Sequence, residues 1–548
     1  MDKEVAVLIG GESGQGIDFA GRILGEFFNE QGLYCFSSRE YESVIKGGHT
    51  YSIVRASEKE VLCSKIKLDY IIALNEDCLR HLKNLKTNGK IICDKGLKIE
   101  KSRGITAIRI PFDEIVEKFG KIFLNSACIS AMLCVSNYDM NEFMKLIKKE
   151  KEQNQKVVNF IFNYIKKNYS KIIERKKEKS VRKGEMLSGN EAIALGMKTA
   201  GLERYYAYPM TPATTILHYL AKKQREFNML ALQLENEISV INCALGSAYA
   251  GKKTAVGTSG GGFDLMHEAL SLAGMAEIPI LVINVQRGGP STGIPTHTSQ
   301  TDLLSVVYSS HGEFPRIVLA PSTTEEAYEK SAEALNLAWK FQIPVILLSD
   351  KSLSEESKTT SLKKIENLKI NFEKGSKKYM FSKNGISPLI IPGTDTIVKS
   401  NSYEHDEEGY TTEDPEMAAK MQEKRAKKRE YLIEEMKKLE TVKKYGNSDN
   451  IIISWGFSAS ELREAVKNVR KPVKIIQPIY IEPFPVWEIE NELKKAKKVI
   501  IVEKNHDAQL AKIIRENTGF SIENKILKYD GTVFDPDELA EKINGMLK

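Results

Sequence analysis

The sequence predicts an α/β protein of three domains with mostly parallel sheets. Its 548 residues match about three domains of roughly 150 to 200 residues each. Short apolar runs alternate with amphipathic stretches, as in chains whose strands and helices alternate. A Lys-rich stretch at 165–186 and a polar stretch at 354–383 interrupt this alternation. We therefore expect domains at 1–180, 186–355 and 386–548, with a linker at 356–385.

The composition excludes several classes of protein. No segment has the 18 or so uninterrupted apolar residues that span a bilayer, and the start, MDKEVAVLIGG, lacks a signal-peptide pattern. None of the 7 cysteines falls in a CxxC pair, which suits free thiols in a reducing compartment. The net charge of +7 is spread along the chain rather than gathered into a basic block. We expect a cytoplasmic protein that binds neither membrane nor nucleic acid.

The first third has a glycine-rich loop between a predicted strand and a predicted helix. Strands are expected at 5–10, 69–74 and 90–94, and the first leads into a loop containing Gly11, Ser13, Gly14 and Gly16. Backbone N–H groups and the positive end of a helix dipole meet at such a loop and favour a phosphate. The spacing departs from the dinucleotide fingerprint, so tight packing of the turn is the alternative. The loop is a candidate phosphate or coenzyme A site. A second glycine pair, in Lys46-Gly47-Gly48-His49, is better explained as a tight turn.

The middle third places an acidic residue at the start of a buried helix. Apolar residues recur at helical spacing within 233–251, and Glu237 lies at the start of that helix. A carboxylate there either interacts with the helix dipole or serves as a working acid, and spacing alone favours the dipole role. The strands expected around it are 205–209, 254–259, 279–285, 315–320 and 344–350.

Four motifs of the middle third resemble the alpha subunit of 2-oxoacid:ferredoxin oxidoreductases. They are YPMTP (208–212), the Glu-Asn-Glu run (235–237) with its following glycines, GTSGGGFDLMHE (257–268) and QRGGPSTGIPT (286–296). The first departs from the family's YPITP at Met210, a change that conserves volume. The first third resembles the family's gamma module, and 404–428 resembles part of the alpha subunit's second domain. The resemblance implies a thiamine-diphosphate pyrimidine-binding domain in the middle and a transketolase C-terminal-like domain at the end.

The resemblance also implies roles for individual residues. These enzymes use thiamine diphosphate, whose aminopyrimidine is activated by a carboxylate. Glu237 stands nine residues before Gly246, as in the family, and Glu235 is the alternative activator. Thr211, held in its loop by two prolines, is expected to contact cofactor and substrate unless it is an ordinary turn threonine. The same cofactor-binding turn includes Tyr208 and Pro209.

Two further groups complete the predicted site. Arg287 follows an apolar strand, where its guanidinium suits a substrate carboxylate or a coenzyme A phosphate, unless it is an ordinary loop arginine. Ser259, Gly260 and Gly261 follow another strand, and their small size suits close approach of the cofactor ring or of a partner subunit. The expected catalytic residues are therefore Glu237, Thr211 and Arg287.

Other parts of this chemistry are missing from the sequence. It has neither a GDG with a downstream Asn for Mg²⁺ and diphosphate nor a cysteine set for a [4Fe–4S] cluster. His267 and His297 lack a second ligand at metal-binding spacing, so no metal site is expected on this chain. The resemblance thus implies a beta subunit that carries Mg²⁺ and the cluster, with the active site shared between the two. In the last third, strands are expected at 450–456, 472–478 and 498–505, and 504–506 is predicted to be a solvated loop.

The predicted function is that of a gamma–alpha fused subunit of a 2-oxoacid:ferredoxin oxidoreductase. With its beta subunit it would convert a 2-oxoacid and coenzyme A into acyl coenzyme A and CO₂ while reducing ferredoxin. The substrate, whether 2-oxoglutarate, pyruvate or a related acid, stays open. The alternative is a non-catalytic subunit that binds a nucleotide or coenzyme A.

Overall fold

The computed structural model describes residues 4–42, 48–99, 104–174, 184–374, 377–393 and 397–548. They form two compact units, Met1–Leu187 with Glu356–Ser361, and Ser188–Glu355 with Leu362–Lys548. Lys46 and Gly47 of the predicted tight turn and residues 175–183 of the Lys-rich stretch lie outside the described residues. Within the described ranges no helix has both the length and the apolar character needed to cross a membrane.

The first unit is built on an eight-stranded sheet in the order β6-β5-β4-β1-β3-β2-β14-β7. Strands β1, β4, β5 and β6 pair in parallel, whereas β1, β3, β2 and β14 pair antiparallel. β1 is buried on both faces, with Val7 and Ile9 in one core and Ala6 and Leu8 in the other. The strands are β1 Glu4–Glu12, β2 Tyr34–Glu40, β3 His49–Ser57, β4 Leu68–Ala73, β5 Leu85–Asp94, β6 Thr106–Ile110, β7 Glu185–Ser188 and β14 Ser357–Thr360.

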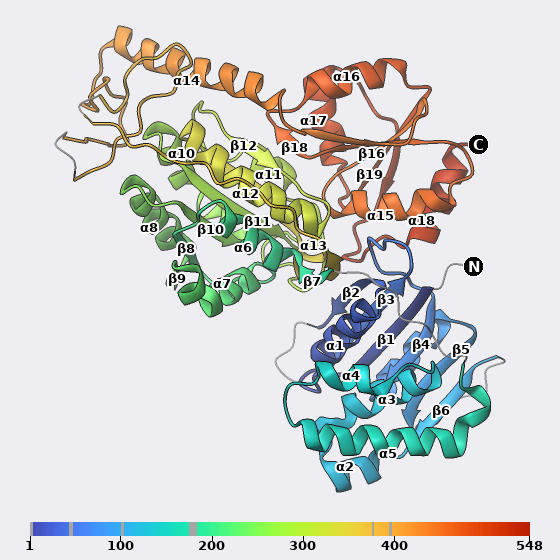
Figure 1. The fold of residues 1–548 in the computed structure, drawn as a ribbon. Helices are drawn as coiled ribbons and strands as arrows, with labels where there is room; N and C mark the ends of the chain where they lie inside the picture. Colours follow the sequence, from blue (N-terminus) through green and yellow to red (C-terminus); the bar gives the residue numbers. More distant parts are fainter. Residues whose placement is uncertain (1–3, 43–47, 100–103, 175–183, 375–376, 394–396) are drawn as a thin grey trace. The chain divides into compact units, whose positions relative to one another are not determined.

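Helices cover one face of this sheet and enclose the larger core (Figure 1). α1 packs on β1, β2 and β3, and α3 packs between the sheet and α5. The apolar residues of α1 recur at helical spacing and form one buried stripe, whereas α3 is buried on all sides from Ala127 to Val135. The helices are α1 Ile17–Glu30, α2 Phe112–Phe119, α3 Leu124–Val135, α4 Met140–Leu146 and α5 Lys151–Tyr169.

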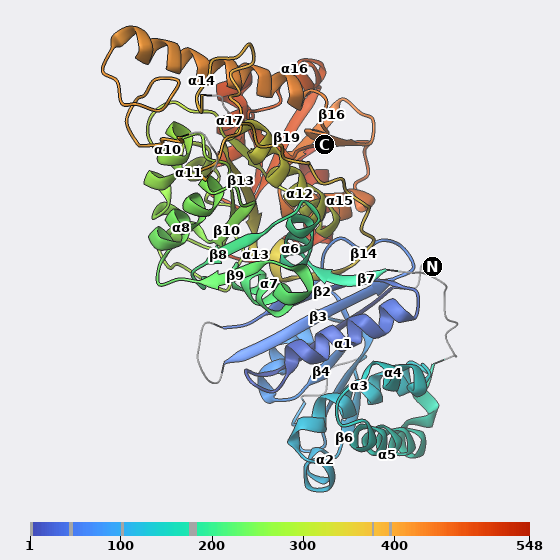
Figure 2. The ribbon, with the colours of Figure 1, turned by 60° about the vertical axis from the view of Figure 1, so that its left-hand side comes forward.

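The second unit contains a seven-stranded sheet in the order β18-β12-β13-β11-β10-β8-β9. All its neighbours pair in parallel except β18, which comes from the last third of the chain. The central strands are continuous apolar runs because helices cover both faces (Figure 2). The strands are β8 Arg204–Ala207, β9 Leu230–Gln233, β10 Thr254–Thr258, β11 Ile280–Gln286, β12 Ile317–Leu319, β13 Pro344–Asp350 and β18 Tyr480–Glu482.

The helices around this sheet connect its parallel strands. α6 packs on α7 and α12, and α8 packs on β8, β10 and α10. The helices are α6 Gly189–Thr199, α7 Thr214–Phe227, α8 Glu237–Tyr249, α9 Gly260–Asp264, α10 His267–Met275, α11 Leu303–Val307, α12 Thr324–Phe341 and α13 Lys351–Glu355.

The last third adds a five-stranded sheet in the order β15-β17-β16-β19-β20, parallel except for β15. Its strands are β15 Val442–Tyr445, β16 Asn450–Ser454, β17 Lys474–Pro478, β19 Lys498–Glu503 and β20 Asn524–Leu527. Its helices are α14 Pro415–Met436, which precedes the sheet, α15 Phe457–Ala465, α16 Val486–Lys495, α17 Gln509–Thr518 and α18 Pro536–Met546. The predicted α/β class with mostly parallel sheets is confirmed, and the first sheet differs in having an antiparallel half.

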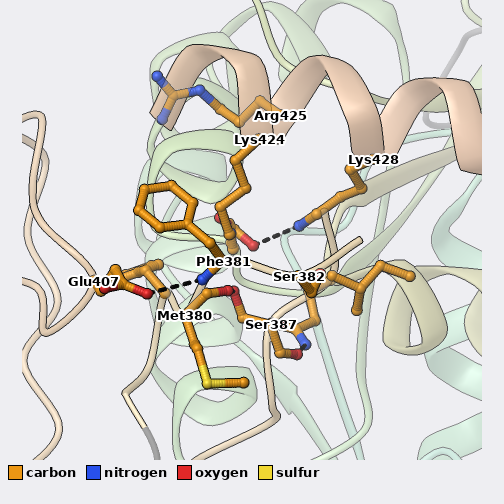
Figure 3. A network of polar contacts seen from close by, with 12 residues as sticks. Met380, Phe381, Ser382, Ser387, Glu407, Lys424, Arg425 and Lys428 are labelled. Atoms are coloured by element: carbon orange, nitrogen blue, oxygen red, sulfur yellow. Dashed lines mark hydrogen bonds and ion pairs between the residues drawn. The ribbon is translucent and has the colours of Figure 1, made fainter. Parts of the chain in front are cut away.

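The segment between α13 and α14 lies beside buried charges that link α14 to Glu277, the residue after the C-cap of α10. It begins with β14, inside the predicted linker, and continues in the second unit with little regular structure. Figure 3 shows Lys424 and Lys428 of α14 directed toward this segment, where the Phe381 N–H donates to Glu407 Oε1 at 3.0 Å. Lys428 Nζ donates to Glu277 Oε2 at 2.5 Å, and Lys424 bonds the other oxygen of the same carboxylate.

Candidate active site

The predicted site residues gather at one edge of the seven-stranded sheet. The YPMTP turn follows β8, the Ser259–Gly262 stretch follows β10, and Arg287 follows β11. Because these strands are parallel neighbours, their carboxyl ends lie at the same edge, where α/β proteins bind ligands. The start of α8, with Glu237, follows β9 at this edge.

Glu237 is a buried carboxylate with an unused oxygen. Its side chain is 3% exposed, and Oε1 has no hydrogen-bond partner among the described residues. Such an oxygen costs about 1–3 kcal/mol unless a donor reaches it. A Cβ on Gly262 would lie 2.5 Å from this oxygen, so only glycine fits there. The residues present therefore fit a ligand that donates a hydrogen bond to Glu237.

The two candidate glutamates differ in burial. Glu235 is exposed, and its carboxylate accepts a hydrogen bond from the hydroxyl of Ser239. The N-cap of α8 is Asn236, whose side chain accepts from the Ser239 N–H at 2.9 Å. Glu235 and Asn236 thus bond the backbone and side chain of the first turn of α8, and Glu237 is the buried member of the pair of glutamates.

The structure joins Thr211 to Arg287. Arg287 Nη1 donates to the Thr211 carbonyl oxygen at 2.7 Å, which fixes the half-buried guanidinium against the YPMTP turn. Asn190 holds the other end of the turn, because its Nδ2 donates to the Pro212 carbonyl oxygen at 2.9 Å. Tyr208 is exposed at the start of the turn, and Pro209 is partly buried.

The glycines after β10 have different surroundings. A Cβ on Gly260 would lie 2.7 Å from Asp302 Oδ2, whereas a Cβ on Gly261 would meet no atom within 4 Å. The hydroxyl of Ser259 is buried and has no partner among the described residues. Gly260 therefore leaves room for Asp302, and Gly261 leaves an open surface.

A cavity of about 530 Å³ opens beside these loops. Arg287, Gly260, Gly261, Asn284 and Asp302 line it from the middle domain. Asp302 was not predicted from the sequence, because no motif or spacing marks it. Burial raises the pKa of Asp302 to about 6, although the Asn284 amide, which donates to Oδ2 at 3.2 Å, opposes this rise.

The loop after β19 forms another wall of this cavity, with Asn505, His506, Asp507 and Gln509. The prediction of a solvated loop at 504–506 was wrong for Lys504 and Asn505, which are buried. They are buried because the backbone of Gln300 exchanges hydrogen bonds with this loop. Gln300 N–H donates to the Lys504 carbonyl oxygen at 2.9 Å, and Asn505 Nδ2 donates to the Gln300 carbonyl oxygen at 3.1 Å.

The glycine-rich loop of the first unit ends β1 and begins α1. Gly14 and Gly16 have φ values of 89° and 74°, a conformation that favours glycine. Gly16 is the N-cap of α1 and provides no side-chain cap. Gly11 leaves room for the side chain of Gln15, and Ser13 Oγ lies 2.9 Å from Thr50 Oγ1. The first N–H groups of α1 are thus free of a side-chain cap, a geometry compatible with both the phosphate and the tight-turn interpretations.

No metal centre is evident in the part of the chain that the structure describes. Within those residues, no group of three or more His, Cys, Asp or Glu side chains could hold a metal ion.

Comparisons with known proteins place the chain in a family. The 2-oxoacid:ferredoxin oxidoreductase subunit alpha of Sulfolobus sp is 32% identical to it over 99% of this chain and 96% of that relative. The chain belongs to the 2-oxoacid:ferredoxin oxidoreductase family. The 2-oxoglutarate synthase subunit KorA of Methanocaldococcus jannaschii is 33% identical over 66% of this chain and 100% of its own length.

Three family models match successive parts of the chain. "Pyruvate flavodoxin/ferredoxin oxidoreductase, thiamine diP-bdg" matches residues 195–424, the part with Glu237 and Arg287. "Pyruvate ferredoxin/flavodoxin oxidoreductase" matches 6–170, and "Pyruvate:ferredoxin oxidoreductase core domain II" matches 448–539. The predicted family, with its gamma-type module at the N-terminus, is confirmed.

A solved structure of the family covers the whole chain. It is the 2-oxoglutarate:ferredoxin oxidoreductase from Magnetococcus marinus, with 2-oxoglutarate, coenzyme A and succinyl-CoA bound. The TM-score is 0.92, the identity is 29%, and the match covers 100% of both chains. These likenesses support the prediction of an oxidoreductase subunit over the non-catalytic alternative.

Proposed function

We propose that this chain is the gamma–alpha fused subunit of a coenzyme A-dependent 2-oxoacid:ferredoxin oxidoreductase. With a beta subunit it converts a 2-oxoacid, coenzyme A and oxidised ferredoxin into acyl coenzyme A, CO₂ and reduced ferredoxin. The observation that carries this proposal is the unpartnered, buried carboxylate oxygen of Glu237 beneath Gly262. An oxygen of this kind suits a cofactor that donates a hydrogen bond to it.

The cofactor is thiamine diphosphate, and this chain holds its pyrimidine side. Glu237 accepts a hydrogen bond from the pyrimidine or shares a proton with it, and Thr211 faces the reacting end. Bound thiamine diphosphate supplies the nucleophilic carbon and the electron sink for decarboxylation. The remaining contacts come from the residues of the two neighbouring loops, Tyr208, Pro209, Ser259, Gly260 and Gly261.

The beta subunit supplies the diphosphate side of the site, Mg²⁺ and a [4Fe–4S] cluster. Exposed apolar side chains surround the site on this chain, and such patches suit a protein interface. They are Tyr208, Leu232, Ile238, Leu265 and Ile294. The open surface at Gly261 gives a partner room to approach. Ferredoxin then takes up electrons from the partner's cluster.

Arg287 binds the substrate carboxylate, and the glycine-rich loop of the first unit binds a phosphate of coenzyme A. The Magnetococcus enzyme, similar over the whole chain, was solved with 2-oxoglutarate and coenzyme A. For this protein 2-oxoglutarate and pyruvate are therefore the first substrates to test. Gly11, Ser13, Gly14 and Gly16 form the loop proposed for coenzyme A.

The test is reduction of ferredoxin or of a low-potential dye that depends on both a 2-oxoacid and coenzyme A. We expect activity from the chain purified with its beta subunit and none from the chain alone. Activity of the isolated chain would contradict the shared site. A stable complex with an intact cluster but no turnover on any 2-oxoacid would favour the non-catalytic alternative.

Replacing Arg287 with Lys should weaken substrate binding. Lysine cannot keep the bond to the Thr211 carbonyl oxygen and also present a planar fork to a carboxylate. The loss of a charged hydrogen bond, about 2 kcal/mol, predicts that KM rises about 30-fold. Steady-state kinetics of the complex measure this, with Arg225→Lys on the exposed face of α7 as the control. An unchanged KM would remove Arg287 from the substrate site.

A further inference from the structure

Asp302 is an acidic residue in a cavity that is proposed to bind an anion. It lines the cavity beside Arg287, the residue proposed to bind an anion. In the part of the chain that the structure describes, its two oxygens accept only from Asn284 Nδ2 at 3.2 Å and from Thr301 Oγ1 at 3.4 Å. Arg287 acts on its charge from across the cavity, and this attraction does not outweigh the effect of burial. A carboxylate so placed would repel the anion that Arg287 attracts.

Hydrogen bonds from the middle and the last third of the chain fix the position of Asp302. Its N–H donates to Gln286 Oε1 at 3.0 Å, at the end of β11. The preceding Gln300 donates through Nε2 to the Trp455 carbonyl oxygen at 2.8 Å, and Gln509 Nε2 donates to the Thr301 carbonyl oxygen at 2.8 Å. The middle and last thirds of the chain thus hold the segment that carries Asp302, and Gly260 leaves space for the carboxylate.

The other charged groups of the cavity offset the burial of Asp302 only in part, because the charge of Arg287 lowers its pKa less than burial raises it. Arg287 is the single arginine or lysine among the described residues that line it. Asp264 is largely exposed and lies 3.6 Å from His267. From the loop after β19, Asp507 pairs with His506 at 3.1 Å and with Lys512 at 3.2 Å. A bound anion therefore adds negative charge close to the most buried of three carboxyl groups, where like charges interact strongly.

The amide of Asn284 can form a hydrogen bond with either protonation state of the Asp302 carboxyl group. Asn284 is fully buried, and its Oδ1 has no partner among the described residues, while Nδ2 donates to Asp302. Rotation of the amide by half a turn would present Oδ1 as the acceptor for the O–H of a neutral Asp302. The site thus provides a donor for the ionised carboxylate and an acceptor for the protonated one.

We propose that Asp302 takes up a proton from solvent when a 2-oxoacid anion binds beside Arg287, so that substrate affinity depends on pH through this residue. This inference rests on the proposed function, since it assumes that Arg287 holds the substrate. Asp302 is then a residue that determines affinity. The proton comes from water and returns to it when the anion leaves.

The direction of the effect follows from linkage. Burial raises the pKa of Asp302 in the ligand-free protein to about 6, with the Asn284 hydrogen bond opposing the rise, and a bound anion raises it further. Between pH 6 and 8 binding therefore consumes a proton. The KM for the 2-oxoacid should rise with pH, by about tenfold per pH unit at most.

The experiment measures KM and kcat of the complete complex from pH 6 to 8.5, for the wild type and for Asp302→Asn. The asparagine stands in for the neutral acid, so the KM of the variant should be lower than that of the wild type at pH 8 and nearly independent of pH. Asp264→Asn is the matched control, because it removes an exposed carboxylate from the same cavity. It should retain the wild-type slope, since solvent screens that charge.

A second measurement counts protons directly and does not depend on turnover. Calorimetric titration of the complex with oxalate, in two buffers of different ionisation enthalpy, counts the protons taken up on binding. At pH 7.5 we expect uptake approaching about one proton for the wild type and none for Asp302→Asn.

The outcomes separate this inference from the proposed function. Normal turnover with the same pH dependence of KM in Asp302→Asn, or oxalate binding without proton uptake, overturns the role of Asp302 alone. A fall in kcat with KM unchanged also overturns it. A complex that neither turns over any 2-oxoacid nor binds oxalate overturns the proposed function and this inference together.

Discussion

Replacing Glu237 with Gln is expected to lower the rate of acyl coenzyme A formation by about 100- to 10,000-fold. The amide keeps the size of the side chain but cannot exchange a proton with the cofactor. Folding should not suffer, because the change removes a buried carboxylate whose Oε1 has no partner among the described residues. Ferredoxin reduction by the complex measures the rate, and gel filtration with iron content shows whether the assembly is intact.

Glu235→Gln is the matched control, two residues earlier in the same motif. Its carboxylate is exposed and interacts with Ser239, so this variant should keep most of the activity. If the two variants lost activity equally, the difference in burial could not be used to identify Glu237 as the residue that activates the cofactor. If Glu235→Gln alone were inactive, the assignment would be reversed.

Replacing Glu277 with Gln is expected to destabilise the second unit by about 3–5 kcal/mol. The Glu277 carboxylate is buried and pairs with Lys424 and Lys428, and Lys378 is buried nearby (Figure 3 shows Lys424 and Lys428). Without the carboxylate, three buried lysines would lose their counter-charge, and each would have to give up its proton or remain charged without a partner in the core. Urea unfolding of the full chain measures the loss.

Two further variants test this explanation. Glu277→Gln combined with Lys428→Met should recover part of the lost free energy of unfolding, because fewer charges are left unpaired. Glu226→Gln breaks the largely exposed pair with Lys223, and it should change stability by about 1 kcal/mol or less. Equal losses for Glu277→Gln and Glu226→Gln would argue against a buried charge effect.

The buried pair also predicts a dependence of stability on pH. Burial alone would raise the pKa of Glu277, but Lys428 and Lys424 outweigh it and hold the pKa at about 2, below the ordinary value of 4.5. The folded protein therefore binds its proton less readily than the unfolded chain. The contribution of Glu277 to stability is complete above pH 4.5 and is lost as the pH falls toward 2. Unfolding curves at pH 6 and pH 4 should differ less for Glu277→Gln than for the wild type.

The motifs of the middle third carried most of what the sequence could predict. Thr211 and Arg287 lie in loops that follow parallel strands, and Glu237 begins the helix after another strand of the same sheet, so recognising the strands was enough to bring these residues to one edge. Asp302 lies far along the loop after β11. Its place depends on the Gln300 contacts with the last third of the chain, which no local pattern encodes.

Two other features could not be read from local patterns. Lys504 and Asn505 are polar residues after a strand, and these are usually solvated. Here the buried Glu461 pairs with the Lys504 ammonium at 2.8 Å, and the Gln300 carbonyl oxygen accepts from Asn505. The antiparallel half of the first sheet was not predicted, because β3 breaks the apolar alternation with buried polar residues. Among them is Arg55, which donates to the Cys63 carbonyl oxygen at 2.9 Å and pairs with Glu4.

The position of β14 in the chain determines which fragments of the protein can fold as monomers. Residues 356–361 belong to the first unit although 168 residues of the second unit, Ser188–Glu355, precede them in the chain. β14 lies between β2 and β7 in the sheet. A polypeptide that stopped at residue 187 would expose the backbone of β2 as an unpaired edge, which invites pairing with other molecules. Fragment 1–187 should therefore self-associate, and a peptide spanning 355–362 should restore the monomer.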